Sequence, residues 1–121
     1  MKISIFGLGY VGAVSAGCFA AEGHRVIGVD SVADKIDLIN RGHSPIVEAE
    51  IGEIIEESVR NGSFRATQDP SAAVQETDLS IVCVGTPSQP NGNLDLRYIR
   101  RICEQIGHAL QVKREDRKSV V

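Results

Sequence analysis

The sequence of 121 residues contains no tryptophan, two tyrosines and three phenylalanines, so aromatic residues make up only 4% of it. With so few aromatic rings, a surface that stacks nucleic-acid bases is not expected. Basic residues are not in excess, since 13 lysines and arginines stand against 16 acidic residues, a formal net charge of -3. No basic field therefore draws the chain to nucleic acid or an anionic membrane. No apolar run is long enough to span a bilayer.

Cysteine is also scarce. Cys18, Cys83 and Cys103 are widely spaced, and no pair of them has the Cys-x-x-Cys spacing. Neither a disulfide framework nor a zinc site is expected, and a reducing compartment, the cytoplasm, fits best. We interpret all three cysteines as core thiols rather than nucleophiles. The three histidines have no ligand spacing either, so no metal site is predicted.

Short apolar segments alternate with helical patterns along the chain. Strands are expected at 2–6, 25–29, 64–67 and 79–84. Helices are expected between these strands and after the last one. Continuously apolar strands that alternate with helices are typical of a parallel sheet covered on both faces. The predicted fold is therefore α/β, a Rossmann-like doubly wound parallel sheet.

Local signals predict where several helices begin. Ser31 followed by Asp34 resembles a capping box. Asp69 is expected to cap a helix whose first residue is Pro70, and Asp95 to cap the last helix. In the helices after the second and the fourth strand, apolar residues at helical spacing mark one apolar face.

The C-terminal residues suggest an unfinished sheet. Residues 113–118 read as a charged turn, and 119–121 as the start of a fifth strand. We therefore expect residues 1–121 to form one nucleotide-binding domain at the N-terminal end of a longer protein, truncated at the start of its fifth strand.

A glycine motif, G-x-G-x-x-G, follows the first strand. Gly7 would let the strand turn tightly into the helix, Gly9 would let a pyrophosphate approach the backbone, and Gly12 would let the helix pack closely. The amides around Tyr10 and Val11 would then face the phosphates at the positive end of the helix dipole. The motif alone is weak, but its place between a strand and a helix favours dinucleotide binding over a merely structural turn.

An acid follows the second strand at the expected distance. Asp30 lies 18 residues after Gly12, close to the spacing of a ribose-binding carboxylate. Such a carboxylate repels a 2′-phosphate, so NAD is preferred over NADP; the alternative is a simple helix-capping acid. Lys35 could approach the adenosine or be merely solvated. Thr86, at the end of the fourth strand, could meet the nicotinamide side or only shape a turn.

The same N-terminal residues also allow an export signal. An apolar run follows Met1-Lys2, and Ser15-Ala16-Gly17-Cys18 resembles a lipidation site. However, glycines interrupt the run, Lys2 is its only basic residue, and an export signal has no reason to precede a strand that ends in Asp30. An exported lipoprotein is the weaker alternative.

Four blocks in order carry a family resemblance: FGLGYVG, GHRVIGVD, KIDLINRGHSPIVE and CVGTPSQPNGNLDL. Over essentially all 121 residues the chain resembles the start of the UDP-glucose/GDP-mannose dehydrogenase family. SPIVE and NGNLDL are most similar to the members that oxidise GDP-mannose for alginate synthesis. Oxidation of UDP-glucose and a stand-alone NAD-sensing module stay open as alternatives.

The resemblance implies a four-electron oxidation with NAD as cofactor and a sugar nucleotide as substrate. By position, it implies NAD contacts at Tyr10, Val11, Asp30, Lys35 and Thr86. It also implies that the catalytic cysteine, most of the sugar-nucleotide site and the homo-oligomer interface belong to later segments, so no catalytic residue is expected in this chain. One departure stands out: Ala49-Glu50-Ile51 replaces the usual Pro-Gly-Leu, and a helix is expected to start earlier there.

Overall fold

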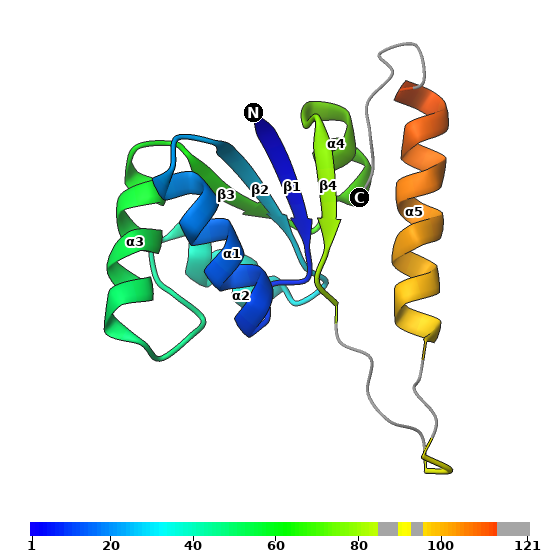
Figure 1. Ribbon diagram of the computed structural model, residues 1–121, viewed down its shortest axis with the longest axis horizontal. Helices are drawn as coiled ribbons and strands as arrows, with labels where there is room; N and C mark the ends of the chain where they lie inside the picture. Colours follow the sequence, from blue (N-terminus) through cyan, green and yellow to red (C-terminus); the bar gives the residue numbers. More distant parts are fainter. Residues whose placement is uncertain (85–89, 93–95, 114–121) are drawn as a thin grey trace.

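The computed structural model describes residues 1–84, 90–92 and 96–113. The strands are β1 (Lys2–Phe6), β2 (Arg25–Val29), β3 (Phe64–Thr67) and β4 (Leu79–Val82). The helices are α1 (Tyr10–Ala21), α2 (Ala33–Asn40), α3 (Ala49–Arg60), α4 (Pro70–Glu76) and α5 (Arg97–Lys113). Strands and helices alternate as predicted, and two helices, α2 and α3, separate β2 from β3 (Figure 1). The expected early start of the helix at Ala49 is confirmed.

The four strands form one parallel sheet in the order β3-β2-β1-β4. β1 lies at its centre, with Lys2 opposite Arg25 on one side and Ile3 opposite Leu79 on the other. The chain thus builds outward to β3 and then crosses to the far side of β1 for β4. A ligand crevice forms at the carboxyl ends of strands where the order reverses in this way. The Rossmann-like fold class is confirmed.

Two apolar cores cover the two faces of the sheet, because successive side chains of a strand point to opposite faces. One core joins the sheet to α1, α2 and α3 through Ile3, Ile5, Leu8, Ala16, Ala20, Val26, Ile36, Ile39, Ile51, Ile55, Phe64 and Ala66. The other joins it to α4 and α5 through Phe6, Ile27, Val29, Ala73, Val74, Ile102, Ile106 and Ala109. The sheet is therefore held between two helical layers, as a doubly wound fold requires.

The strands are not continuously apolar, contrary to the prediction. Ser4 of β1 and Ser80 of β4 are buried, and their hydroxyl oxygens lie 2.6 Å apart. The Thr77 hydroxyl donates to the carbonyl of Ala73 at 2.8 Å, and its oxygen lies 3.0 Å from Ser4 Oγ. A buried hydroxyl is tolerated when it has a hydrogen-bond partner, and each of these three hydroxyls has one.

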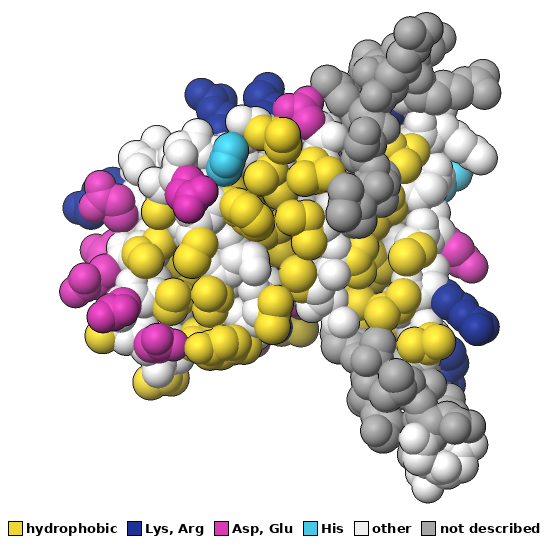
Figure 2. All heavy atoms as spheres, in the orientation of Figure 1, with side chains coloured by type: hydrophobic (Ala, Val, Ile, Leu, Met, Phe, Trp, Pro, Cys, Tyr) yellow, Lys and Arg dark blue, Asp and Glu magenta, His cyan; other side chains and the backbone are white. Residues whose placement is uncertain are grey.

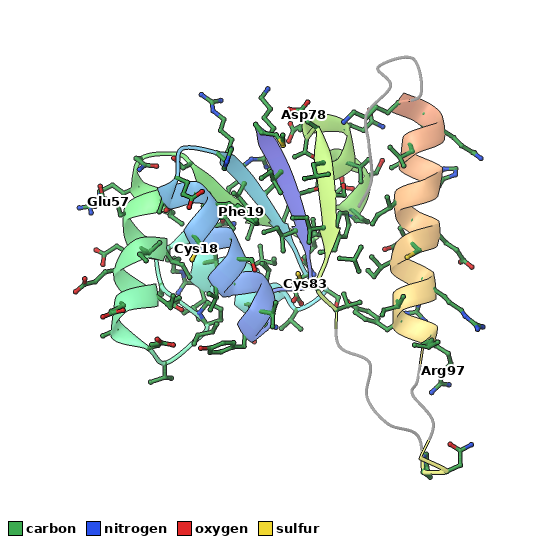
Figure 3. The ribbon with its side chains drawn as sticks, viewed as in Figure 1. Cys18, Phe19, Glu57, Asp78, Cys83 and Arg97 are labelled. Carbon is green, nitrogen blue, oxygen red and sulfur yellow. The ribbon has the colours of Figure 1, made fainter. Side chains whose placement is uncertain are left out.

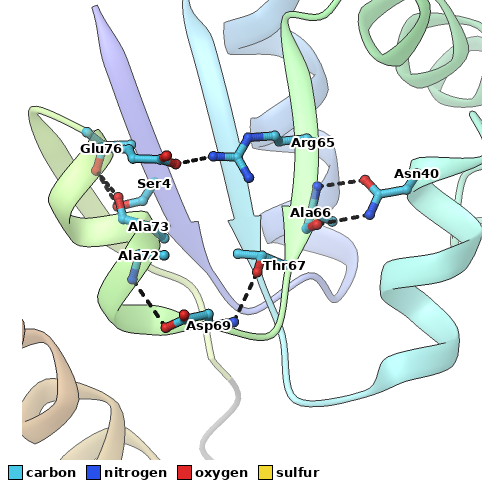
Figure 4. Close-up of polar contacts among 10 residues, drawn as sticks. Ser4, Asn40, Arg65, Ala66, Thr67, Asp69, Ala72, Ala73 and Glu76 are labelled. Atoms are coloured by element: carbon cyan, nitrogen blue, oxygen red, sulfur yellow. Dashed lines mark hydrogen bonds and ion pairs between the residues drawn. The ribbon is translucent and has the colours of Figure 1, made fainter.

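Side chains satisfy backbone groups both at the edge of β3 and at the start of α4 (Figure 4). Asn40 exchanges two 2.9 Å hydrogen bonds with the backbone of Ala66, so its amide takes the place of a neighbouring strand. Asp69 accepts from the amides of Ser71 and Ala72, so the predicted cap of α4 is confirmed. The predicted capping box at Ser31 is wrong, because Val32 occupies the cap position of α2 and makes no side-chain cap bond.

Helix α5 lies beyond β4 in Figure 1 and packs on α4. Its last residue, Lys113, is 3% exposed, and its ammonium donates to the carbonyls of Val74 and Thr77 at the end of α4. The charged turn predicted from 113 onward is therefore wrong at Lys113, which is helical and buried. The predicted cap Asp95 and the predicted strand 119–121 lie outside the described residues.

The outer side of α3 is acidic, as the left of Figure 2 shows. The exposed carboxylates there are Glu50, Glu53, Glu56 and Glu57. None of the helices in the described part of the chain is both long and apolar enough to cross a membrane.

Candidate nucleotide-binding site

The glycine turn joins β1 to α1 at the carboxyl edge of the sheet. Gly7 directly follows β1. Its amide donates to the carbonyl of Val29 at 2.8 Å, and this hydrogen bond ties the turn to β2. Leu8 is fully buried and rests against Gly28, where any side chain would collide with it. The turn is therefore anchored in the core by a residue between the first two glycines of the motif.

The three glycines of the motif have different structural needs. Gly7 has a φ of 100°, and a Cβ there would lie 2.7 Å from the carbonyl oxygen of Cys83. A Cβ at Gly12 would lie 1.7 Å from the carbonyl oxygen of Gly7, so the helix can approach the turn only through glycine. Among the residues that the structure describes, and apart from its two chain neighbours, a Cβ at Gly9 would meet no atom within 4 Å. Packing thus requires glycine at positions 7 and 12. Gly9 instead faces open space on the solvent side, from which a pyrophosphate would approach.

The N-terminus of α1 is open to an anion. Within the residues that the structure describes, no side chain caps this helix, and its first turn has no acidic residue. The first amides of a helix have no intrahelical acceptor, and they lie at the positive end of its dipole. Tyr10 and Val11 are both exposed there, at 62% and 64%. The Tyr10 hydroxyl donates to Glu48, at the cap of α3, over 3.3 Å.

Asp30 lies at the carboxyl end of β2 and binds the turn directly. Its Oδ2 accepts from the amide of Leu8 at 2.9 Å and its Oδ1 from the amide of Val32 at 3.0 Å. Lys35 lies 3.3 Å from the same Oδ2. Burial opposes ionisation of Asp30, but these two amides and the Lys35 charge outweigh it, so the pKa of the carboxyl lies below its usual value. Asp30 is a carboxylate at neutral pH.

The structure therefore brings the predicted glycine turn, Asp30 and Lys35 together at one edge. Thr86, also predicted there, lies outside the described residues. The alternative role of Asp30 as a helix-capping acid is not observed, because Val32 is the cap residue of α2 and Asp30 accepts from the amide of Val32 itself. The bond from Leu8 to Asp30 and the contact of Tyr10 with Glu48 were not predicted, since no local spacing signals either one.

Two of the three cysteines differ from their predicted places, whereas Cys83 packs against the core (Cys18 and Cys83 are labelled in Figure 3). Cys18 and Cys103 are exposed, so the interpretation of both as core thiols is wrong. Cys83 follows β4 beside the glycine turn and is half-buried, and burial raises the pKa of its thiol. A raised pKa makes a thiolate, and hence a nucleophile, less available at neutral pH. The described residues also contain no cluster of three or more His, Cys, Asp or Glu that could hold a metal ion.

A separate hollow of about 390 Å³ opens at the opposite edge of the sheet. Charged side chains line much of it: Lys2, Arg25, Arg65, Glu76 and Asp78. Asp78 marks this edge in Figure 3, at the other end of β4 from Cys83. Ligands of parallel sheets bind at the carboxyl ends of strands, and this hollow lies at the amino ends. The glycine turn and Asp30 therefore remain the candidate site.

Known sequences match this chain closely. The model of the UDP-glucose/GDP-mannose dehydrogenase family, NAD binding domain, matches residues 1–121. GDP-mannose 6-dehydrogenase of Azotobacter vinelandii is 55% identical over 121 residues, which are 100% of this chain and 28% of that protein. UDP-glucose 6-dehydrogenase of Rhizobium meliloti is 38% identical over 112 residues, 92% of this chain and 26% of that protein. The chain thus spans about a quarter of the length of these relatives.

A solved structure agrees with the sequence relatives. The fold superimposes on a crystal structure of a ternary complex of GDP-mannose dehydrogenase from Pseudomonas aeruginosa with a TM-score of 0.89. The two chains share 55% sequence identity, and the match covers 91% of this chain and 25% of that one. A UDP-glucose dehydrogenase from Pyrobaculum islandicum matches with a TM-score of 0.88 at 34% identity, over 93% of this chain and 26% of that one.

Proposed function

Because this chain belongs to the UDP-glucose/GDP-mannose dehydrogenase family and is an NAD-binding domain, we propose that it binds NAD for the oxidation of a sugar nucleotide. Residues 1–121 serve as the nucleotide-binding domain, and the sugar nucleotide and the catalytic cysteine are held by segments outside this chain. GDP-mannose is the first candidate substrate, because relatives named for it are 55% identical. UDP-glucose is the second, at 38% identity.

One observation supports the proposal above the others: the hydrogen bond between Asp30 and the amide of Leu8. It joins the acid that would hold a ribose to the turn that would hold a pyrophosphate. The two halves of a dinucleotide site are thus fixed relative to one another before any ligand binds. Preorganisation of this kind lowers the cost of binding.

In the proposed complex each site residue has one task. The amides of Tyr10 and Val11 face the pyrophosphate, and Gly9 leaves room for it. Asp30 accepts hydrogen bonds from the adenosine ribose, with Lys35 beside it. Thr86, outside the described residues, is proposed for the nicotinamide side. When bound, NAD supplies the acceptor for the hydride that leaves the sugar alcohol.

This chain contributes binding and orientation rather than bond making. Cys83, the cysteine closest to the glycine turn, is half-buried and has a raised pKa, so it is not proposed as the nucleophile that captures an aldehyde. Four electrons would leave the alcohol in two oxidations, each of which needs one NAD held in the same place. A rigid turn anchored by Leu8 suits such repeated use of one site.

The proposal also covers the product of the reaction, the cellular location and the oligomeric state. Relatives from Azotobacter and Pseudomonas are named GDP-mannose 6-dehydrogenase, which supports GDP-mannuronate for alginate as the product. A cytoplasmic location is supported by the free Cys18, Cys83 and Cys103. A homo-oligomer would form through segments outside this chain.

Calorimetric titration of the folded chain with NAD and with NADP tests the proposal. NAD is expected to bind with one site per chain, and NADP more weakly. Far-UV circular dichroism on the same sample verifies that the chain is folded. A folded chain that binds neither dinucleotide, or that prefers NADP, would contradict the proposal.

The substrate is tested on the enzyme that contains this domain. GDP-mannose and UDP-glucose are compared by the appearance of NADH absorbance. Two NADH per molecule of GDP-mannose, with little turnover of UDP-glucose, is the expected result. The reverse preference would move the proposal to UDP-glucose, and one NADH per sugar would contradict a four-electron oxidation.

A further inference from the structure

The hollow at the amino edge of the sheet gathers cationic side chains from three neighbouring strands. Lys2 of β1 lies directly opposite Arg25 of β2, and Arg65 of β3 lies opposite Ile27. Ile27 belongs to the core that α4 and α5 cover, and side chains two residues apart in a strand share a face. Arg25 therefore points to the same face as Ile27, and so do its neighbours on β1 and β3. All three cations line the hollow of about 390 Å³.

The charges around the hollow are only partly compensated. Arg65 forms an ion pair with Glu76 at the end of α4 (Figure 4). Asp78 uses its carboxylate to accept a 3.2 Å hydrogen bond from the backbone amide of Lys2. In the described part of the chain, the side chains of Lys2 and Arg25 have no hydrogen-bond or ion-pair partner. Two cations of the hollow are thus not paired within these residues.

Fold stability does not account for this pair of cations. Like charges directly opposite one another on neighbouring strands are destabilising. Lys2 and Arg25 are both exposed, so a dissolved ligand can reach them. An anion bound between the two side chains would remove the repulsion.

The charge of the pair favours a phosphate group over a carboxylate. A phosphate monoester carries about -1.5 to -2 charges at pH 7 and has three acceptor oxygens, so it can pair with an ammonium and a guanidinium together. A carboxylate carries a single charge and would leave one of the two cations unpaired. The guanidinium of Arg25 can bind two phosphate oxygens at once, and the ammonium of Lys2 adds a compact charge.

The hollow is also larger than one phosphate. Its volume of about 390 Å³ lies in the range of small-molecule pockets. The polar side chains of Ser63 and Gln75 line it beside the cations. The hollow therefore has room for an organic group attached to the phosphate.

We propose that the amino edge of the sheet is an anion site, in which Lys2 and Arg25 bind the phosphate group of a small ligand, either inorganic phosphate or a phosphate ester. The site is separate from the proposed dinucleotide site at the carboxyl edge. Glu76 limits the affinity, because it repels the phosphate and holds Arg65 in an ion pair. Without the charge of Glu76, Arg65 becomes a third phosphate ligand.

A nitrogen-15 NMR titration of the chain tests the site, because it locates a bound anion by residue. Inorganic phosphate and glucose 6-phosphate are the probes, and acetate and glucose are the control ligands. Each titration is done with and without saturating NAD, which would occupy the glycine turn. Both probes should shift the amides of Lys2, Arg25 and Asp78 whether or not NAD is present. Acetate should bind more weakly, and glucose should cause no shift.

Three variants test the groups that carry the site. Arg25→Gln and Lys2→Met should each raise the Kd for phosphate about three- to fivefold, as for exposed charge pairs, and the double variant about tenfold or more. Glu76→Gln should lower this Kd about threefold or more. Arg25→Gln should unfold at the same or a higher urea concentration, since it relieves a repulsion. If it does not fold, Lys2→Met and Glu76→Gln still test the site.

A matched control removes an equal charge on the opposite face of the sheet. Arg41 is exposed at the end of α2, in the helical layer of α1, α2 and α3. Arg41→Gln should leave the Kd for phosphate unchanged. Equal weakening by Arg41→Gln and Arg25→Gln would show a general charge effect and overturn the inference.

The remaining outcomes separate the two ligands and the two sites. Tighter binding of glucose 6-phosphate than of inorganic phosphate supports a phosphate ester as the ligand, and equal or weaker binding supports the free ion. Shifts confined to residues 7–12 and abolished by NAD would place the phosphate at the glycine turn and overturn the inference. A folded chain that binds phosphate at the amino edge but does not bind NAD contradicts only the proposed function.

Discussion

The amide of Leu8 donates a 2.9 Å hydrogen bond to the carboxylate of Asp30, across the ends of two neighbouring strands. Leu8 is fully buried, so the bond links the core to the polar edge of the site. The bond also helps to lower the pKa of Asp30. The acid is therefore both a ligand-binding group and a structural tie of the glycine turn.

At low pH, Asp30 should no longer contribute to the free energy of unfolding. Because its pKa in the folded chain lies below the ordinary 3.8, the contribution is fully present above pH 3.8 and is lost as the pH falls through the folded value. Urea unfolding across a pH series should show the natural chain more stable than Asp30→Asn at neutral pH. The difference should shrink below about pH 4. A constant difference down to the acid limit would contradict this role.

Gly9→Ala should separate binding from folding. Its φ is -76° and its ψ is -157°, an extended conformation open to alanine, and a methyl there meets no atom within 4 Å among the described residues beyond its chain neighbours. The free energy of unfolding should change by no more than about 1 kcal/mol, because the entropy gain of alanine is opposed by its poorer fit at a helix N-cap. The Kd for NAD should rise about tenfold or more, because the methyl occupies the side from which a pyrophosphate approaches. Unchanged NAD binding would contradict the assignment of the turn.

Gly12→Ala should show the opposite pattern. A methyl at this position would lie 1.7 Å from the carbonyl oxygen of Gly7, so α1 must move away from the turn. A loss of at least about 1–3 kcal/mol in the free energy of unfolding is expected, measured by urea denaturation. Full stability would show that the helix can shift at no cost.

Asn40→Asp should test the side chain that pairs with β3. The native amide both donates to and accepts from the backbone of Ala66 at 2.9 Å. A carboxylate keeps the acceptor but turns an oxygen toward the carbonyl of Ala66. A loss of about 1–3 kcal/mol in the free energy of unfolding is expected at neutral pH. Asn61→Asp, at an exposed turn, is the matched control and should cost much less.

Lys113→Met should destabilise the packing of α5 on α4. The buried ammonium donates to the carbonyls of Val74 and Thr77, at the negative end of the α4 dipole. Methionine fills similar space without donors, so thermal unfolding should show a loss of about 1.5–3 kcal/mol. Lys35→Met, which removes a partly exposed lysine, should cost less. An equal loss in both variants would contradict a capping role for Lys113.

The interior of α1 shows why some predictions failed. Apolar residues of α1 are distributed over all sides of the helix, so the hydrophobic pattern does not indicate which face is buried. Its small residues do, since Gly12, Ala13, Ala16, Gly17 and Ala20 are the buried ones. Cys18 falls outside that stripe and is exposed. In α5, Cys103 is likewise exposed, next to the buried stripe of Ile102 and Ile106.

The strands, the glycine turn and the place of Asp30 could be predicted because each depends on residues close together in the sequence. Period-two and period-3.6 patterns mark the elements, and glycine is the residue that tolerates the turn at Gly7. Right-handed crossover connections reduce the number of possible strand orders but do not select one of them. Local rules were therefore sufficient for the fold class and for the type of site.

The tertiary structure alone decided which groups meet. Leu8 and Asp30 are 22 residues apart, and Val74 and Lys113 are 39 apart, yet both pairs are in hydrogen-bond contact. No spacing rule specifies such contacts, because they depend on how the strands pair and on which helix face turns inward. The sequence by itself determined a Rossmann-like sheet with a phosphate turn and an acid. Only packing decided that the acid is tied to the turn by Leu8 and balanced by Lys35.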